Sequence, residues 1–437
     1  MKQTIYNYLR EFCRNPIVFA LGMAGFALHA GSAALRIARF FPYPQLLDFS
    51  GFYAASAALR AGLNPYTAPN AFIDSLRMAQ HIPFRPPLIY NPPFWAWLLQ
   101  PFTCFFFPVS AWLWVIFNLG ILGCCVMALS KLAAVRGMNQ RLGLGILVLT
   151  FGPVVLDISL GQTSIVLLAG ALAIGQLLDR RSRISEWGIG IIQALLVGVK
   201  LFPVIWLGAF VLLHRWRMVG LCFLLTAGIL SSLWVAYPPA NRLYWQGFLG
   251  GRLESALTAP GIDDQSLTAC LQRLMLSERY IVPALRPEVR DTIQWQPPLT
   301  IFPAWPRYIS HAISIILLLQ CAFLLWRLPG GDLQAGFFLW LVLGLVILAH
   351  IERYNHALLL PALAWLWGRG QHTHSLVIAV YFLCGISRLN HLWVIALHYP
   401  WAAVISAAGL GAVVLAGWAI ANEMRSARTM ITVRLHQ

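Results

Sequence analysis

The sequence predicts an all-α polytopic membrane protein that forms one integral membrane domain over residues 1–437. Hydrophobic residues make up 59% of the chain and charged residues only 11%, with a mean hydropathy of +0.70. Soluble domains carry roughly a quarter of charged residues, so a soluble globule is excluded. The apolar residues form continuous runs rather than the short alternating segments of a barrel. Runs of roughly 20 apolar residues cross the hydrocarbon core as helices, and this length leaves room for about twelve spans.

The positions of basic residues predict the topology, because short loops rich in Lys and Arg face the cytoplasm. These basic regions are the N-terminus, the C-terminal tail and the loops at Lys131, Arg180, Arg215, Arg327 and Arg369. Both termini are therefore expected on the cytoplasmic side of a bacterial inner membrane. The net charge of +16 is explained by these loops and by anionic headgroups, so membrane lipids are expected partners and nucleic acid is not.

The number of crossings between basic loops identifies one apolar segment that does not span. Three apolar runs, 16–35, 92–107 and 108–130, precede Arg136. Three crossings would place Arg136 outside, so the short run 92–107, which is flanked by prolines and contains two tryptophans, is expected to lie at the outer interface. The run 16–35 is too long for the apolar core of a signal peptide and is expected to remain as the first span.

The remaining runs predict pairs of spans joined by short loops. The run 187–213 is expected to break between Lys200 and Pro203, because proline interrupts a helix. Two segments are too long or too polar to be ordinary connections and are expected outside, 36–107 and 237–307. The other expected spans lie near 141–157, 162–178, 218–236, 308–327, 333–350, 354–368, 375–392 and 400–420.

Asp48 is the first candidate catalytic residue. It stands at the outer end of the first span, before an amphipathic stretch that ends at Gly62. An aspartate in this position is typically a helix N-cap. Its aromatic and proline-rich surroundings instead favour a carboxylate that acts as general base on a sugar hydroxyl. The neighbouring tyrosines are Tyr53, Tyr66 and Tyr90.

A second candidate is the polar segment 350–356, which lies between two apolar runs. It contains His350, Glu352, Arg353, Tyr354, Asn355 and His356. Charged groups at membrane depth are costly and usually functional, so this cluster is interpreted as a site for an anionic group, with Arg353 and His356 as donors. Lys200 is surrounded by apolar residues and needs a partner, for which a phosphate is suited.

Other polar residues near the expected outer face have two readings. Asp157, Gln162 and Thr163 either bind a sugar or cap the next helix. Asp263, Asp264, Gln265 and Ser266 precede a short helix that contains Arg273; capping needs only some of them, so others are expected to face the site. Arg388, Asn390 and His391 are either further donors or structural pairs. Asp74 is expected to be a solvated helix residue.

Several of these residues, in this order, resemble the GT-C superfamily and its bacterial branch of polyprenyl-phosphate-mannose-dependent mannosyltransferases, which includes the phosphatidylinositol mannoside enzyme. The resemblance covers most of the chain. It rests on Asp48 with the FYAASAALRAGLNPY stretch, the YNPPF motif that contains Tyr90 and Asn91, Gly161-Gln162, Lys200 with Pro203, Asp264-Gln265-Ser266-Leu267, and His356 with LLLPAL.

The resemblance implies a GT-C-type fold and an inverting transfer of a hexose, with mannose as the first candidate, from a polyprenyl-phosphate donor to a glycolipid or glycan acceptor outside the cytoplasm. By position, Asp48 is similar to the general base, and Lys200, Arg353 and His356 to groups that stabilise the leaving phosphate. Contacts to sugar or acceptor are expected from Tyr53, Tyr90, Asn91, Gln162, Asp264, Gln265, Glu352 and Tyr354.

The sequence also departs from the family pattern. The family often has Ser-Pro before its histidine, whereas this chain reads AHIERYNHALL, so Glu352 and Arg353 are expected to accompany a different sugar or acceptor. A DxD pair is lacking, and the eight cysteines show no ligand-like spacing. We therefore expect no metal and no cofactor, and a monomer.

Two other readings stay open at the level of sequence. A transporter or flippase for lipid-linked sugars would use the same basic and aromatic groups for binding alone, although internal repeats of the kind found in many transporters are not visible. A structural subunit of an envelope assembly would need none of the outer polar residues. Another polyprenyl-phosphate-linked sugar, such as arabinofuranose, is also compatible with the motifs.

Overall fold

The computed structural model describes residues 15–87, 89–180, 182–249, 264–275, 305–326, 332–348, 351–386 and 407–436. Its helices up to the α6 span are α2 Pro16–Ile37, η1 Ala38–Phe40, α3 Leu47–Arg60, α4 Asn70–Ala79, α5 Pro93–Leu98, η2 Gln100–Cys104 and α6 Phe107–Leu132. Then follow α7 Met138–Thr150, α8 Gly152–Leu160, α9 Ser164–Leu178, α10 Arg183–Val199, η3 Phe202–Trp206, α11 Leu207–Leu212, α12 Trp216–Ala236 and α13 Pro238–Leu249. The remainder are α15 Leu267–Met275, α18 Trp305–Trp326, α19 Leu333–Ile347, η5 Arg353–Leu359, α20 Leu360–Arg369, α21 Gln371–Ile386 and α24 Ala408–His436.

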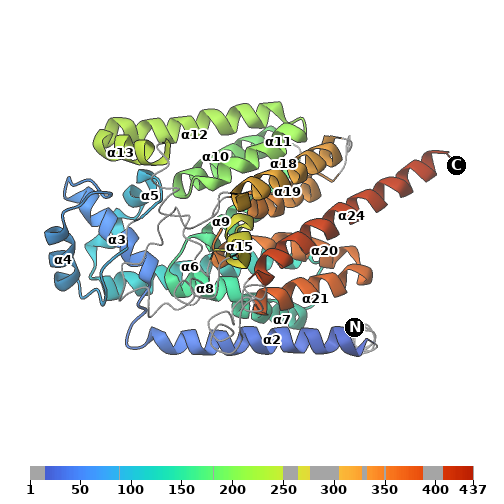
Figure 1. Ribbon diagram of the computed structural model, residues 1–437, viewed down its shortest axis with the longest axis horizontal. Coiled ribbons are helices and arrows are strands. Elements are labelled where there is room, and N and C mark those ends of the chain that lie inside the picture. The colour runs from blue at the N-terminus through green and yellow to red at the C-terminus, as the bar shows by residue number, and fades with distance from the viewer. Residues whose placement is uncertain are drawn as a thin grey trace.

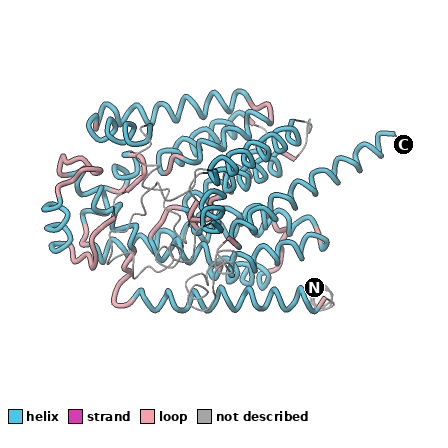
Figure 2. Tube along the Cα trace, viewed as in Figure 1, coloured by secondary structure: helices cyan, strands magenta, loops and turns pink. Residues whose placement is uncertain are grey.

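The described residues form helices and loops without a β-strand (Figure 2), which confirms the helical class. Four helices, α2, α6, α12 and α18, are long and apolar enough to cross a membrane, and the bent pair α7–α8 makes a fifth if it counts as one span. The chain is therefore a multi-pass membrane protein. The count of about twelve spans stays a prediction, because helices such as α9 and α19 are shorter than a full crossing.

The helices are arranged side by side, with two distinct ends (Figure 1). Helix α2 begins at the end toward which α24 points, and α3, α4, α5 and α13 gather at the opposite end, called here the α3 end. The main helix pairs are α10 with α12, α2 with α21, α21 with α24, and α9 with α10. The segment with Asp48 thus lies opposite the beginning of the first span.

The expected span 141–157 is bent rather than straight. Helices α7 and α8 meet at Phe151 with an angle of 57°, because Pro153 at the start of α8 cannot continue the hydrogen-bond ladder of α7. The Gly152 amide, released from the ladder, donates to Nδ1 of His29 at 2.9 Å. Nε2 of the same ring lies 2.9 Å from the Tyr381 carbonyl, so His29 joins α2, α8 and α21 at the bend.

Two other expectations about broken segments agree with the structure. Between residue 92 and the start of α6 at Phe107, only the six-residue helix α5 and the five-residue helix η2 form, and neither is long enough to cross. The run 187–213 breaks where expected, because α10 ends at Val199, Lys200 is extended, and η3 begins at Phe202. Both breaks leave backbone carbonyls that side chains bind: Ser110 donates to the Phe102 carbonyl and Asn91 to the Val199 carbonyl.

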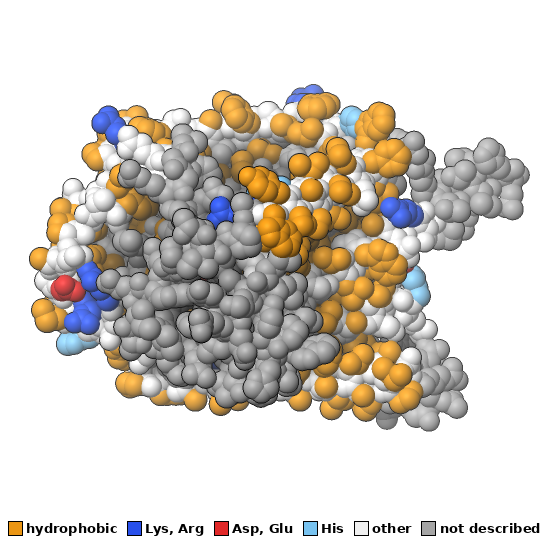
Figure 3. Space-filling view, viewed as in Figure 1, with side chains coloured by type: hydrophobic (Ala, Val, Ile, Leu, Met, Phe, Trp, Pro, Cys, Tyr) orange, Lys and Arg blue, Asp and Glu red, His pale blue; other side chains and the backbone are white. Residues whose placement is uncertain are grey.

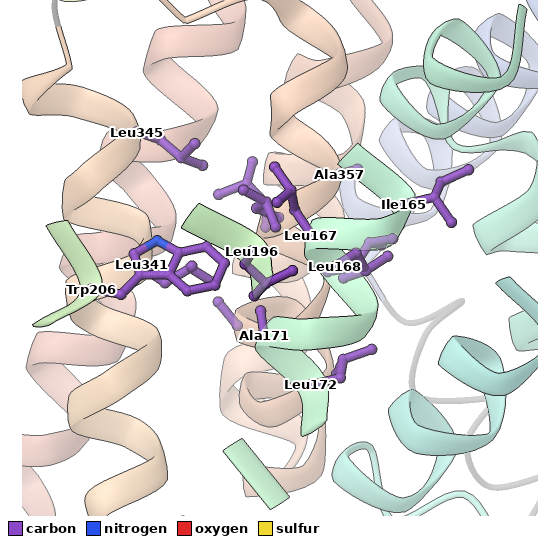
Figure 4. Packing of buried hydrophobic residues seen from close by; sticks show 14 of the residues in the cluster. Ile165, Leu167, Leu168, Ala171, Leu172, Leu196, Trp206, Leu341, Leu345 and Ala357 are labelled. Carbon is purple, nitrogen blue, oxygen red and sulfur yellow. The ribbon is translucent and has the colours of Figure 1, made fainter. Parts of the chain in front are cut away.

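A continuous hydrophobic core lies between α9, α10, α19 and η5 (Figure 4). Leu167, Leu168 and Ala171 of α9 are fully buried and pack near Leu196 of α10 and Ala357 of η5. Gln162 precedes α9, Lys200 follows α10, and Arg353 and His356 lie within η5. The core therefore holds segments that are far apart in the sequence in one fixed arrangement.

The described surface is rich in exposed apolar side chains, as expected for lipid-facing helices (Figure 3). Hydrophobic side chains spread over the described part of this face, whereas the charged ones are few and include a group at the end with α3 and α4. Helix α6 shows the same character, since Ile116 is 61% exposed. Such residues would be unfavourable in water and are stabilised by lipid.

Candidate functional site

Asp48 lies in the first turn of α3, where its side chain does not cap the helix. The N-cap position is Leu46, which has no side-chain cap. The carboxylate instead accepts a hydrogen bond from Nε2 of Gln162 through Oδ2, at 2.9 Å. The capping interpretation of Asp48 is therefore wrong, because the side chain points toward the turn between α8 and α9 rather than toward its own backbone.

Gly161 makes the Asp48–Gln162 contact sterically feasible. Its φ of +74° closes α8 in the left-handed region, where glycine has no steric penalty. A Cβ at this position would lie 2.5 Å from Cβ of Phe49 and 2.9 Å from Cβ of Leu46. The turn approaches the start of α3 this closely because residue 161 lacks a side chain, and Gln162 is thereby brought to the carboxylate.

The surroundings of Asp48 raise the pKa of its carboxyl group to about 7. Burial is the main cause, and the negative charge of Glu352 adds to it. The hydrogen bond from Gln162 and the positive charge of Lys200 lower the pKa, but they do not cancel the effect of burial. Near neutral pH the group therefore exchanges between its protonated and ionised forms, as a general base requires.

Lys200 reaches the same region from the extended residue after α10. Its Nζ lies 3.4 Å from Oδ1 of Asn355 and 5.0 Å from the centre of the Tyr354 ring. Oδ1 of Asn355 also accepts from the hydroxyl of Ser164 at 3.3 Å. Asn355 therefore connects the starts of α9 and η5 with Lys200, a role the sequence did not reveal.

Asn91 of the YNPPF motif fixes the backbone that presents Lys200. Its Nδ2 donates to the carbonyl of Val199 at 2.9 Å, and its own carbonyl accepts from the hydroxyl of Tyr66 at 2.7 Å. The side chain is 8% exposed. Asn91 thus holds the backbone carbonyl that directly precedes Lys200.

Asp157 has the capping role that was one of its two readings. Oδ1 accepts from the amide of Ser164 at 2.7 Å and Oδ2 from the amide of Ile165 at 3.3 Å. Both carboxylate oxygens thus bind the first turn of α9. This cap orients the helix whose first residue, Ser164, binds Asn355.

Asp264 and Gln265 join the residues that precede α15 to the polar segment before η5. Oδ1 of Asp264 accepts from the amides of Ser266, at 2.8 Å, and Ile351, at 3.2 Å. The amide of Gln265 donates to the Ile351 carbonyl at 2.5 Å, and Asp264 forms an antiparallel bridge with Glu352. These contacts place the start of α15 directly beside Glu352, and Ser266 caps α15 as expected.

His356 and Arg353 are buried in η5, with 1% and 4% of their surfaces exposed. In the part of the chain that the structure describes, neither ring nitrogen of His356 has a hydrogen-bond partner. A Cβ at Gly409 would lie 2.7 Å from both Cε1 of His356 and Oε1 of Gln265. Helix α24 therefore begins in direct contact with the histidine, a neighbour that no motif had indicated.

Two predicted binding residues lie apart from these contacts. The Tyr53 hydroxyl lies 2.9 Å from Oε1 of Gln80 and 2.8 Å from the Phe105 carbonyl, two acceptors for its single proton, so it holds α3 against neighbouring segments. Tyr90 is 42% exposed. The expectations for Asp263, Arg388, Asn390 and His391 lie outside the described residues.

Among the described residues, no three His, Cys, Asp or Glu side chains gather as a metal site would require. The charged groups instead form a mixed cluster, since the charges of Asp48, Asp157 and Glu352 all act on Lys200. We call Asp48, Gln162, Lys200, Glu352, Tyr354 and Asn355 the carboxylate–lysine cluster. Metal independence remains a prediction.

A sequence model described as glycosyltransferase family 87 matches residues 89–350, more than half of the chain. The chain belongs to glycosyltransferase family 87. The matched segment of this family 87 enzyme includes Gln162 and Lys200, whereas Asp48 precedes it and Glu352 follows it. No curated protein and no solved structure matches the chain.

Proposed function

We propose that this family 87 glycosyltransferase transfers a hexose, with mannose as the first candidate, from a polyprenyl-phosphate donor to an envelope glycolipid or glycan. We further propose that it has a GT-C-type architecture, acts as a monomer in the inner membrane, and carries its site on the extracytoplasmic side. The observation that carries the proposal is the carboxylate of Asp48, held by Gln162 beside a lysine at the α3 side of the bundle.

The geometry of Asp48 supports its role as general base. Gln162 occupies Oδ2, and among the described residues no group binds Oδ1, which leaves that oxygen for the acceptor hydroxyl. Asp48 is partly exposed rather than sealed. A carboxyl group with a pKa of about 7 is a far stronger base than an ordinary aspartate and is still largely ionised above neutral pH.

In the proposed step, the acceptor oxygen attacks C1 of the sugar while its proton passes to Asp48. The bond between C1 and the phosphate oxygen breaks, and polyprenyl phosphate leaves with an additional negative charge. Lys200, Arg353 and His356 are proposed to stabilise that charge, since buried positive groups and N–H donors interact strongly with phosphate oxygens. Attack from the face opposite the leaving group inverts the configuration at C1.

The remaining predicted ligands divide into two groups and a single tyrosine under this proposal. Gln162, Glu352 and Tyr354 belong to the carboxylate–lysine cluster and are proposed to contact sugar or acceptor. Asn91, Asp264 and Gln265 are proposed to support the site through the backbone contacts described above. Tyr90, which is exposed in the loop before α5, is proposed to contact the acceptor.

The test is sugar transfer by purified protein with radiolabelled polyprenyl-phosphate-mannose as donor and a lipid extract of the source membrane as acceptor. Asp48→Asn is expected to lower the rate at least roughly 100-fold, as loss of a general base does. Asp74→Asn is the matched control, because Asp74 lies on α4 outside the cluster. Full transfer by Asp48→Asn would refute the catalytic role.

The same assay separates the competing readings. A flippase would move the labelled donor across proteoliposome membranes without any transfer, in wild type and Asp48→Asn alike. A structural subunit would show neither activity. Transfer from a polyprenyl-phosphate-arabinofuranose donor, with none from the mannose donor, would keep the mechanism but replace the sugar.

A further inference from the structure

A groove at the α3 end is lined by residues that the transfer reaction does not use. It has a volume of about 400 Å³ and lies between the end of α3 and the segment formed by α5 and η2. The lining residues are Arg60, Trp97, Leu98, Gln100, Pro101 and Cys104. Arg60 is the last residue of α3, twelve positions after Asp48, so the groove lies about 18 Å along the helix from the proposed base.

The arginine in this groove carries an uncompensated positive charge. Arg60 is exposed, and its Nη1 makes two long contacts, to Oγ1 of Thr103 at 3.3 Å and to Sγ of Cys104 at 3.4 Å. It forms no ion pair with any residue that the structure describes. Because a guanidinium stays charged at any physiological pH and presents a fork of donors, it is suited to a phosphate group.

The rest of the lining is mostly apolar, with Gln100 as its other polar side chain, and it adjoins the end of a membrane-spanning helix. Trp97 is 44% exposed and Leu98 43% exposed. The side chain of Gln100 contacts the hydroxyl of Tyr237 at 3.5 Å, and Tyr237 directly follows the membrane-spanning helix α12. Tryptophan is typical of the headgroup region. The groove therefore combines a guanidinium that can donate hydrogen bonds to a phosphate with apolar surfaces for the first carbons of an acyl chain.

We propose that this groove binds the head group of an anionic phospholipid from the leaflet at the α3 end. None of the lining residues is acidic, so nothing in the groove pairs with the ammonium of a zwitterionic lipid. No acidic side chain of the lining therefore repels a head group with a net negative charge, and its attraction to Arg60 is retained. This lipid is a resident ligand of the membrane surface and is independent of the sugar donor and acceptor.

The experiment is native mass spectrometry of the delipidated full-length protein titrated with phosphatidylglycerol or phosphatidylcholine. Wild type is expected to retain phosphatidylglycerol in preference to phosphatidylcholine, and Arg60→Gln to lower its affinity for phosphatidylglycerol roughly tenfold. Arg77→Gln is the matched control, because Arg77 lies on α4 at the same end but does not line the groove. Trp97→Ala is expected to weaken both lipids alike.

Three results would overturn the proposal. Equal retention of the two lipids by wild type would remove the charge argument. Unchanged binding by Arg60→Gln would place the lipid elsewhere. Displacement of phosphatidylglycerol by millimolar inorganic phosphate would show that a free anion, rather than a lipid, fills the groove. Elution of each variant as the wild-type peak in size-exclusion chromatography excludes misfolding as the cause.

Discussion

Replacement of Glu352 by Gln tests whether the carboxylate–lysine cluster sets the proton affinity of Asp48. In the proposed mechanism the carboxylate form of Asp48 is the active base, so the rate is expected to be full above its pKa and to fall as the pH drops through it. With a pKa of about 7, roughly half of the groups are ionised at pH 7 and about a tenth at pH 6. The wild-type value of kcat/KM is therefore expected to fall about tenfold between pH 8 and pH 6.

Glu352→Gln removes the second cause of the raised pKa, and Gln162→Ala removes a hydrogen bond that lowers it. The acidic limb of the profile is expected to move to lower pH in the first variant and to higher pH in the second. The assay is transfer from polyprenyl-phosphate-mannose over pH 5 to 9, with each profile normalised to its own plateau. Coincident limbs in all three proteins would refute the assignment of Asp48 as the titrating base.

Three further predictions concern stability and positioning. Because burial disfavours the charged form of Asp48, its ionisation opposes folding as the pH rises from about 4 to about 7. The Asp48→Asn protein is therefore expected to unfold at pH 8 at a temperature no lower than that of wild type, as measured by scanning fluorimetry. Asn91→Ala leaves a buried carbonyl unbound before Lys200 and is expected to cost about 1–3 kcal/mol of stability in denaturant unfolding, with a lower kcat. Gly409→Ala is expected to displace His356 and to raise the donor KM on the order of tenfold, whereas the exposed Gly411→Ala should not.

Local sequence patterns predicted the class of the fold and the places where helices break. Continuous apolar runs, prolines and basic loops each act within a few residues, so the short helices in 92–107 and the break at Lys200 followed from them. The bend at Phe151 could not be predicted from such local patterns. It depends on Pro153 together with His29, which lies more than 100 residues earlier and supplies a hydrogen bond to Gly152.

The polar residues of the carboxylate–lysine cluster could be singled out from the sequence, but their contacts could not. Asp48, Gln162, Lys200 and Glu352 stood out because each is a polar group beside apolar runs. The hydrogen bond between Asp48 and Gln162 joins residues 114 positions apart, and no periodicity carries that information. Tyr53 illustrates the opposite case, because aromatic composition does not distinguish a buried tyrosine that binds its own chain from one that faces a sugar.

The candidate site is built from segments that lie far apart along the chain. The segment matched to glycosyltransferase family 87 contributes Gln162 and Lys200. Asp48 enters from the preceding helix α3, and the following segment supplies Glu352 and Asn355. Helix α24 begins later still, where Gly409 contacts His356. Since burial and charge at Asp48 arise jointly from these parts, the proton affinity of the proposed base is a property of their packing rather than of any single motif.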